Sequence, residues 1–160
     1  MTSSNDIPDD ASLSLGLDLD QFLPYRLNRL AERTSEALFA RYGDRFAINV
    51  AEWRVLAWLS RGTSLTAREI SQRTHMDKVR VSRAIKALET RELLLRRPSE
   101  HDQRAQLLHL TDSGEALLNE LIPEARRFED ELLGTLTGLQ YRDLLDSMQA
   151  LEKRLDQLTH

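Results

Sequence analysis

Apolar residues recur every three or four positions through most of this chain, and this interval is typical of amphipathic helices. Polar or glycine-containing breaks separate the apolar stretches, so the pattern predicts six helices. They are expected over Gln21–Tyr42, from Asn49 to the Arg61–Gly62 break, over Thr66–Thr74, from Asp77 onward, from Thr111 through Leu136, and from Thr137 to Leu158. Gly43 is expected to end the first helix, because glycine is the usual residue just beyond a helix.

Three of these helix starts carry a capping box, in which a short polar side chain and a Glu or Gln three residues later each accept a backbone N–H. The pairs are Asn49 with Glu52, Thr66 with Glu69, and Thr137 with Gln140. Asp77 is expected to cap the fourth helix, and Pro123 predicts a kink in the fifth.

Two short apolar runs, Leu93–Arg97 and Gln106–Leu110, predict a pair of strands. The residues between them have the composition of a turn, and Pro98 rules out a helix that continues through this region. The expected fold class is therefore mainly α with one small β-hairpin.

The helix after Asp77 has two unlike faces. Its buried stripe is expected at Val81, Ala84, Ile85 and Leu88, which are spaced i, i+3, i+4 and i+7. The opposite face and its flanks carry side chains that suit the major groove of DNA, namely Lys78, Val79, Arg80, Ser82, Arg83 and Lys86. A charged helix face is more often simply solvated, so this face alone does not decide between the two readings.

The neighbouring elements favour DNA binding. A short helix precedes the cationic one through a tight turn, as in a helix-turn-helix, and the hairpin that follows adds Arg96, Arg97 and Arg104. Residues 66–104 hold ten basic and six acidic side chains, a net charge of +4, whereas the rest of the chain carries −8. Local charge governs attraction to phosphates, so the asymmetry outweighs the overall net charge of −4.

Several functions are disfavoured. The chain has no cysteine, which excludes thiol chemistry, and its four histidines contain no H-x-x-x-H pair, so no metal site is expected. It has no glycine-rich phosphate loop or nucleophile elbow, so neither an enzyme nor a cofactor is expected. Without a signal peptide or a long apolar run, it is expected to be cytoplasmic and to avoid membranes. A helical protein-interaction module is the remaining alternative.

The run MDKVRVSRAIKALETRELLLRR, the pair Asp102-x-Arg104 and the stretch LLHLTDSGEALL resemble the MarR family of winged helix-turn-helix regulators. The resemblance implies a homodimer whose fourth helix enters the major groove. It also implies that Arg104 enters the minor groove and that Asp102 helps to fix the wing. The chain then divides into a flexible leader (1–18), an N-terminal dimerisation helix (19–48), a winged DNA-binding lobe (49–111) and C-terminal dimerisation helices (112–160).

The leucine stripes of the terminal helices independently favour a homodimer on a palindromic duplex, although single leucines could equally belong to the core of one chain. The stretches FLPYRLNRLA and AEWRVLAWL are similar to family members that respond to aromatic acids or their coenzyme A thioesters. Such an effector would release DNA from a repressor. Candidate effector residues are Tyr25, Arg26, Arg29, Trp53 and Trp58, with the alternative that the tryptophans are core and the arginines surface.

Overall fold

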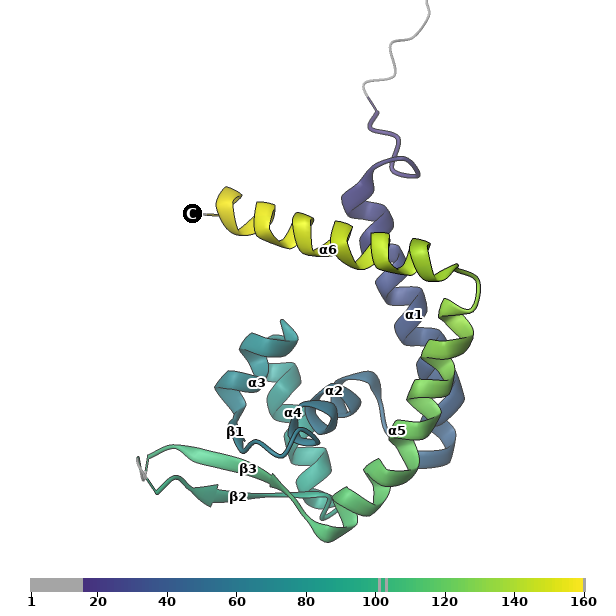
Figure 1. The fold of residues 1–160 in the computed structure, drawn as a ribbon. Helices are drawn as coiled ribbons and strands as arrows, with labels where there is room; N and C mark the ends of the chain where they lie inside the picture. Colours follow the sequence, from purple (N-terminus) through teal and green to yellow (C-terminus); the bar gives the residue numbers. More distant parts are fainter. Residues whose placement is uncertain (1–15, 101, 103, 160) are drawn as a thin grey trace, which may run out of the picture. The chain divides into compact units, whose positions relative to one another are not determined.

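The structure is a computed structural model that describes residues 16–100, 102 and 104–159, and these residues form six helices and one three-stranded sheet (Figure 1). The expected class, mainly α with a small sheet, is confirmed. Most of the expected leader, residues 1–15, lies outside the described residues. In chain order the elements are α1 (Leu23–Phe46), α2 (Val50–Leu59), β1 (Leu65–Thr66), α3 (Ala67–Thr74), α4 (Lys78–Thr90), β2 (Leu94–Pro98), β3 (Gln106–Leu110), α5 (Asp112–Leu133) and α6 (Gly138–Leu158).

The chain forms two compact units that divide between Thr34 and Ser35. In the first unit, Arg29 forms an ion pair with Asp20 at 3.1 Å, which ties the start of α1 to the residues that precede it. The second unit holds the end of α1 and all later elements.

The core of the second unit joins α2, α3, α4, β3 and α5. Its largest fully buried apolar side chains include Ile48, Leu56, Ile70, Ile85, Leu88, Leu108 and Leu121. Because α4 contributes Ile85 and Leu88 to this core, the opposite face of α4 is left toward solvent.

The expected caps of the five later helices are confirmed, whereas α1 begins at Leu23, two residues after the expected Gln21. All three capping boxes have both of their hydrogen bonds. The Asp77 side chain accepts the Arg80 N–H at 2.8 Å, and the Thr111 hydroxyl accepts the Gly114 N–H at 3.0 Å.

The prediction that Gly43 ends the first helix is wrong. Helix α1 continues through Gly43 to Phe46, and the left-handed residue at its end is Ala47, with φ 50°. Gly43 is buried, and a Cβ there would come within 2.6 Å of the Phe39 ring. Its missing side chain therefore makes room for a ring one turn earlier.

The predicted two-stranded hairpin is part of a three-stranded antiparallel sheet in the order β1-β3-β2. Strand β1 is only Leu65–Thr66, which is too short to produce an alternating pattern, and Leu65 pairs with the buried Leu108. Strand β2 starts one residue later than expected and includes Pro98 at its end, on the sheet edge, where proline is tolerated.

Helix α5 ends earlier than the sequence predicts. It stops at Leu133 with Gly134 as its C-cap, so Leu136 lies beyond it. The helix runs through Pro123, and the expected kink there stays a prediction.

Candidate nucleic-acid interface

The turn between α3 and α4 is fixed by local hydrogen bonds. His75 takes the left-handed conformation, with φ 53°, and the Ser71 hydroxyl donates to the Met76 carbonyl at 2.7 Å. Met76 itself is buried.

At the start of α3, the Thr66 N–H and hydroxyl each donate to the Glu69 carboxylate at 2.8 Å, which lowers the pKa of Glu69. The two helices therefore form a defined helix-turn-helix.

Helix α4 has the two faces that its sequence predicts. The stripe of Val81, Ala84, Ile85 and Leu88 is buried, with no more than 4% of any of these residues exposed. On the other side, Val79 is 60% exposed. The rest of this face is exposed as well and consists of Lys78, Arg80, Ser82, Arg83 and Lys86.

The cations of α4 have no ion-pair partner among the residues that the structure describes. These cations are Lys78, Arg80, Arg83 and Lys86. Unpaired guanidinium and ammonium groups keep their donors available for an anionic partner such as a phosphate or for a base edge.

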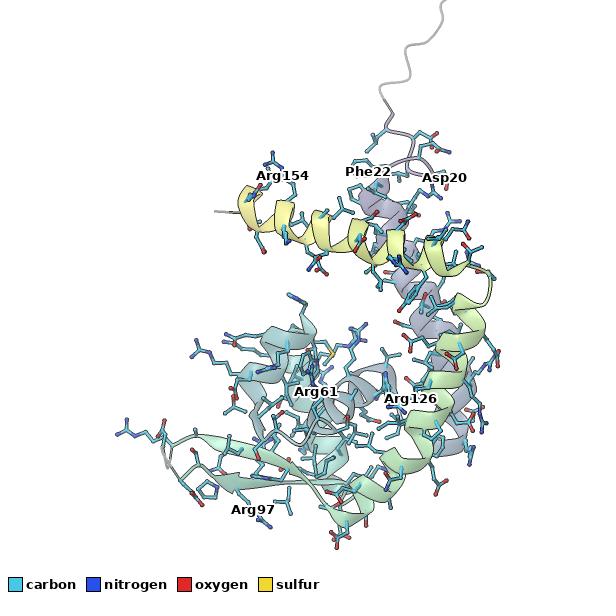
Figure 2. All side chains as sticks on the ribbon, in the orientation of Figure 1. Asp20, Phe22, Arg61, Arg97, Arg126 and Arg154 are labelled. Carbon is cyan, nitrogen blue, oxygen red and sulfur yellow. The ribbon has the colours of Figure 1, made fainter. Side chains whose placement is uncertain are left out.

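The hairpin carries further exposed arginines. The tip is held by the Asp102 side chain, which accepts the Arg104 N–H at 2.9 Å, and by the Asp102 carbonyl, which accepts the Ala105 N–H at 2.9 Å. Arg104 and Arg97 are exposed, and Figure 2 shows Arg97 projecting outward from β2. Arg104 therefore lies beside Asp102 near the end of the hairpin, whose strands run out past α3 and α4 (Figure 1).

Arg96 differs from its neighbours in the hairpin. Its Nε donates to Glu89 Oε1 at 2.8 Å and its Nη2 to Glu89 Oε2 at 3.3 Å, so it links β2 to the last turns of α4. Sequence reasoning grouped Arg96 with the phosphate-reaching arginines, but the structure engages it in this bidentate ion pair. The pair connects the hairpin to α4.

The candidate effector residues are divided between the two units. Tyr25, Arg26 and Arg29 are exposed in the first unit, where Arg29 holds Asp20. In the second unit, Trp53 is partly buried, and its ring centroid lies 5.7 Å from that of Tyr42. Trp58 is also partly buried and lies under two guanidinium groups, with Arg61 at 5.1 Å and Arg73 at 4.9 Å from its ring centroid.

Three cavities or grooves are lined by other residues than Trp53 and Trp58. One of about 340 Å³ lies between the end of α2, β3 and α5, and one of about 830 Å³ lies between the start of α2 and α4. In the first unit, a groove of about 570 Å³ is lined by Arg26, Arg29 and Arg33 together with leucines. Sequence reasoning missed Arg33, although it continues the i, i+3, i+7 spacing of Arg26 and Arg29.

Helix α6 presents an apolar face without cover. In the described residues of this helix no side chain is buried, although Leu144, Met148, Leu151 and Leu155 share one side of it. Among the described residues, no helix is long and apolar enough to cross a membrane, and no group of three or more His, Cys, Asp or Glu side chains could hold a metal ion.

A capped helix-turn-helix followed by a hairpin, with an unpaired cationic face on its second helix, defines a winged helix-turn-helix protein. The MarR family model matches residues 48–105 of this chain. A crystal structure of a MarR/EmrR family transcriptional regulator from Acinetobacter sp. ADP1 superposes with a TM-score of 0.80 at 26% identity, covering 88% of this chain and 99% of that one.

A second solved structure is the transcriptional repressor CouR bound to a 23-mer DNA duplex, which is 31% identical, with a TM-score of 0.71 over 84% of this chain and 94% of that one. The transcriptional repressor NicR of Pseudomonas putida is 34% identical over 70 residues, which is 44% of either chain. The chain belongs to the MarR family of transcriptional regulators. The sequence-based predictions of this family and of a non-enzymatic role are thereby confirmed.

Proposed function

We propose that this regulator binds a palindromic DNA duplex as a homodimer and represses transcription until a small effector releases it. The observation that carries the proposal is the exposed face of α4, whose cations have no ion-pair partner in the described residues. Lys78, Val79, Arg80, Ser82, Arg83 and Lys86 would face the major groove, with Arg97 and Arg104 of the hairpin on the backbone and minor groove. Asp102 would hold Arg104 in position through its backbone N–H.

The uncovered side of α6 supports the dimer. Packing residues 19–48 and 112–160 against the same segments of a second copy would cover the leucines, and residues 49–111 would be the DNA-binding lobe. Two recognition helices would then lie about one turn of DNA apart, roughly 34 Å. CouR was solved with a DNA duplex, and both it and NicR are named repressors, which supports the same role here.

The groove of the first unit supports an acidic effector with an apolar body. Arg26 and Arg33 beside leucine side chains suit a carboxylate or phosphate attached to a ring or acyl chain, while Arg29 is paired with Asp20, which also lines the groove. We therefore keep an aromatic acid or its coenzyme A thioester as the effector class, with Arg26 and Arg29, which line the groove, as its first contacts and with the exposed Tyr25 as a further candidate. Trp53 and Trp58 stay candidates in the second unit, although both have protein partners.

Fluorescence anisotropy with the protein's own promoter region, in a salt series, tests DNA binding. Affinity should fall as salt rises, with a log–log slope of about −0.9 for each phosphate neutralised. Arg104→Ala and Arg83→Ala should each weaken binding on the order of 10-fold or more, while the exposed Arg126→Ala on α5 should leave it unchanged. Salt-independent binding, or equal binding by all three variants, would contradict the proposal.

Calorimetry with an aromatic acid, its coenzyme A thioester and coenzyme A alone tests the effector class. Binding that is lost in Arg26→Ala and that lowers DNA affinity supports it. If none of the three probes binds, the effector class is wrong, while the DNA-binding proposal stands on its own test.

A further inference from the structure

Arg91 joins the end of α4 to the end of α1. Its Nη1 donates to the Ala47 carbonyl at 2.6 Å, and its Nη2 donates to the Phe46 carbonyl at 2.9 Å. These two carbonyls lie 44 and 45 residues before Arg91 in the chain, respectively. Both hydrogen bonds lie within the second unit.

The chemistry of this contact favours arginine. The last carbonyls of a helix have no partner within the helix and carry a partial negative charge. A planar guanidinium can satisfy two of them at once in a fixed geometry, which a lysine ammonium cannot do. Arg91 is itself held by the hydrogen bond of its N–H to the Ala87 carbonyl, as the C-cap of α4. The backbone is therefore held within or next to a helix at both ends of this contact.

The same end of α1 is also held by α5. Arg45 Nη1 lies 3.3 Å from Glu124 Oε1, and Arg45 Nη2 lies 3.5 Å from Glu120 Oε2. Arg41 forms a bidentate ion pair with Glu131. The end of α1 thus contacts α5 through these ion pairs and the end of α4 through Arg91. A displacement of α1 and α5 would reach α4 through Arg91.

We propose that Arg91 is a positioning residue that sets the separation and orientation of the two copies of α4 in the dimer. This inference rests on the proposed function, because it requires a dimer that binds DNA. Arg91 would touch no base; it would make the protein selective for one spacing of the operator half-sites. Without it, each lobe would be freer to move relative to the dimer arms.

The test uses duplexes in which one base pair is inserted or deleted between the half-sites. Each change moves the half-sites by about 3.4 Å and rotates them by about 34°. The full-length wild-type protein should bind the native spacing at least about 10-fold more tightly than either altered one. Arg91→Ala should reduce that ratio to about 2-fold, mainly through weaker binding to the native duplex, and Arg91→Lys should not restore it.

Arg126→Ala is the matched control, because it removes another exposed arginine, and no ion pair in the described residues involves Arg126. It should keep the wild-type ratio. A variant that is merely less stable would lose active protein and weaken binding to all three duplexes equally, leaving the ratio unchanged. If Arg91→Ala does not fold, Arg91→Gln replaces it under the same criterion.

The outcomes separate the two proposals. If the wild-type protein binds no duplex in a salt-dependent way, the proposed function fails. If it binds and discriminates between spacings, but the Arg91 variant discriminates equally well, the function stands and the role of Arg91 is refuted.

Discussion

Gly114, in the first turn of α5, lies directly against the backbone carbonyl of Leu93: a Cβ on Gly114 would come within 2.0 Å of that oxygen. The same oxygen accepts the Thr111 N–H at 3.1 Å. The start of α5 is therefore held against the residue that precedes β2, and only glycine fits there.

We expect Gly114→Ala to destabilise the protein by about 2 to 4 kcal/mol, because the new methyl group would force backbone away from backbone. Urea unfolding followed by circular dichroism measures this. Gly138→Ala is the control: Gly138 also lies in the first turn of its helix, but nothing lies within 4 Å of its Cβ position. It should be neutral or stabilising by up to about 1 kcal/mol. Equal effects of the two substitutions would refute the close approach.

The comparison of Gly114 with Gly43 shows what sequence reasoning could and could not reach. The capped helix starts and the two faces of α4 were predicted correctly, because caps and helical periodicity depend on residues within a few positions of one another. Gly43 was misread as a helix end because its role is to admit the Phe39 ring, and a glycine chosen for packing looks the same in sequence as one chosen for termination.

The features that the sequence did not predict depend on contacts between residues far apart in the chain. Strand β1 exists through its pairing with β3, about 40 residues later, and two residues hold no periodicity. The engagement of Arg96 by Glu89, and of Arg91 by the end of α1, could not be distinguished in sequence from the free arginines of the same segment. The sequence thus located the cationic segment but not which of its arginines have partners within the protein.

Asp102 offers a test of the hairpin tip. Its side chain accepts the Arg104 N–H, so Asp102→Ala should loosen the tip and weaken DNA binding roughly 3- to 10-fold, the cost of one hydrogen bond. Because the tip is exposed, the thermal midpoint should hardly change. Asp102→Asn keeps an oxygen acceptor and should bind DNA at least as well as the wild type. Anisotropy and calorimetry measure the two effects, and an affinity loss as large in Asp102→Asn would point to the negative charge and not to the hydrogen bond.

Glu92 occupies a backbone conformation that suits glycine. Its φ is 56°, directly after the C-cap of α4, and its carbonyl accepts the Thr111 hydroxyl. Glu92→Gly should raise the free energy of unfolding by up to about 1 kcal/mol through relief of this strain. The reciprocal change, Gly62→Ala at φ 73°, should lower it by about 1 kcal/mol, since nothing within 4 Å adds a steric effect. Denaturant midpoints that move in the same direction for both would contradict the strain at Glu92.

Because Tyr42 is buried, we expect the free energy of unfolding to fall at alkaline pH. The residue is buried, and burial raises the pKa of its hydroxyl to about 12, with the positive charge of Arg54 acting in the opposite direction. An exposed tyrosine in the unfolded chain has a pKa of about 10. The folded state therefore holds its proton more tightly, so this contribution is fully present below pH 10 and is lost as pH rises toward 12.

The loss should approach 1.4 kcal/mol for each pH unit above about 10, or roughly 2 to 3 kcal/mol in all. Urea midpoints of the wild type and Tyr42→Phe, measured across this range, isolate it from other alkaline titrations. The wild type should lose stability faster than the variant. Parallel curves for the two proteins would mean that Tyr42 ionises as readily in the folded state as in the unfolded chain.

Leu151 tests whether a second copy covers α6. It is 41% exposed in the single chain and shares its face with Leu144 and Leu155. Leu151→Glu would place a charge in the proposed interface and should raise the dimer dissociation constant on the order of 100-fold, as at an interface hot spot. DNA affinity should fall with it, because each monomer holds only one half-site. Gln149→Glu adds the same charge on the opposite face of α6 and should leave light scattering and DNA binding as they were. A Leu151→Glu protein that remains dimeric at low concentration would show that another surface joins the two copies.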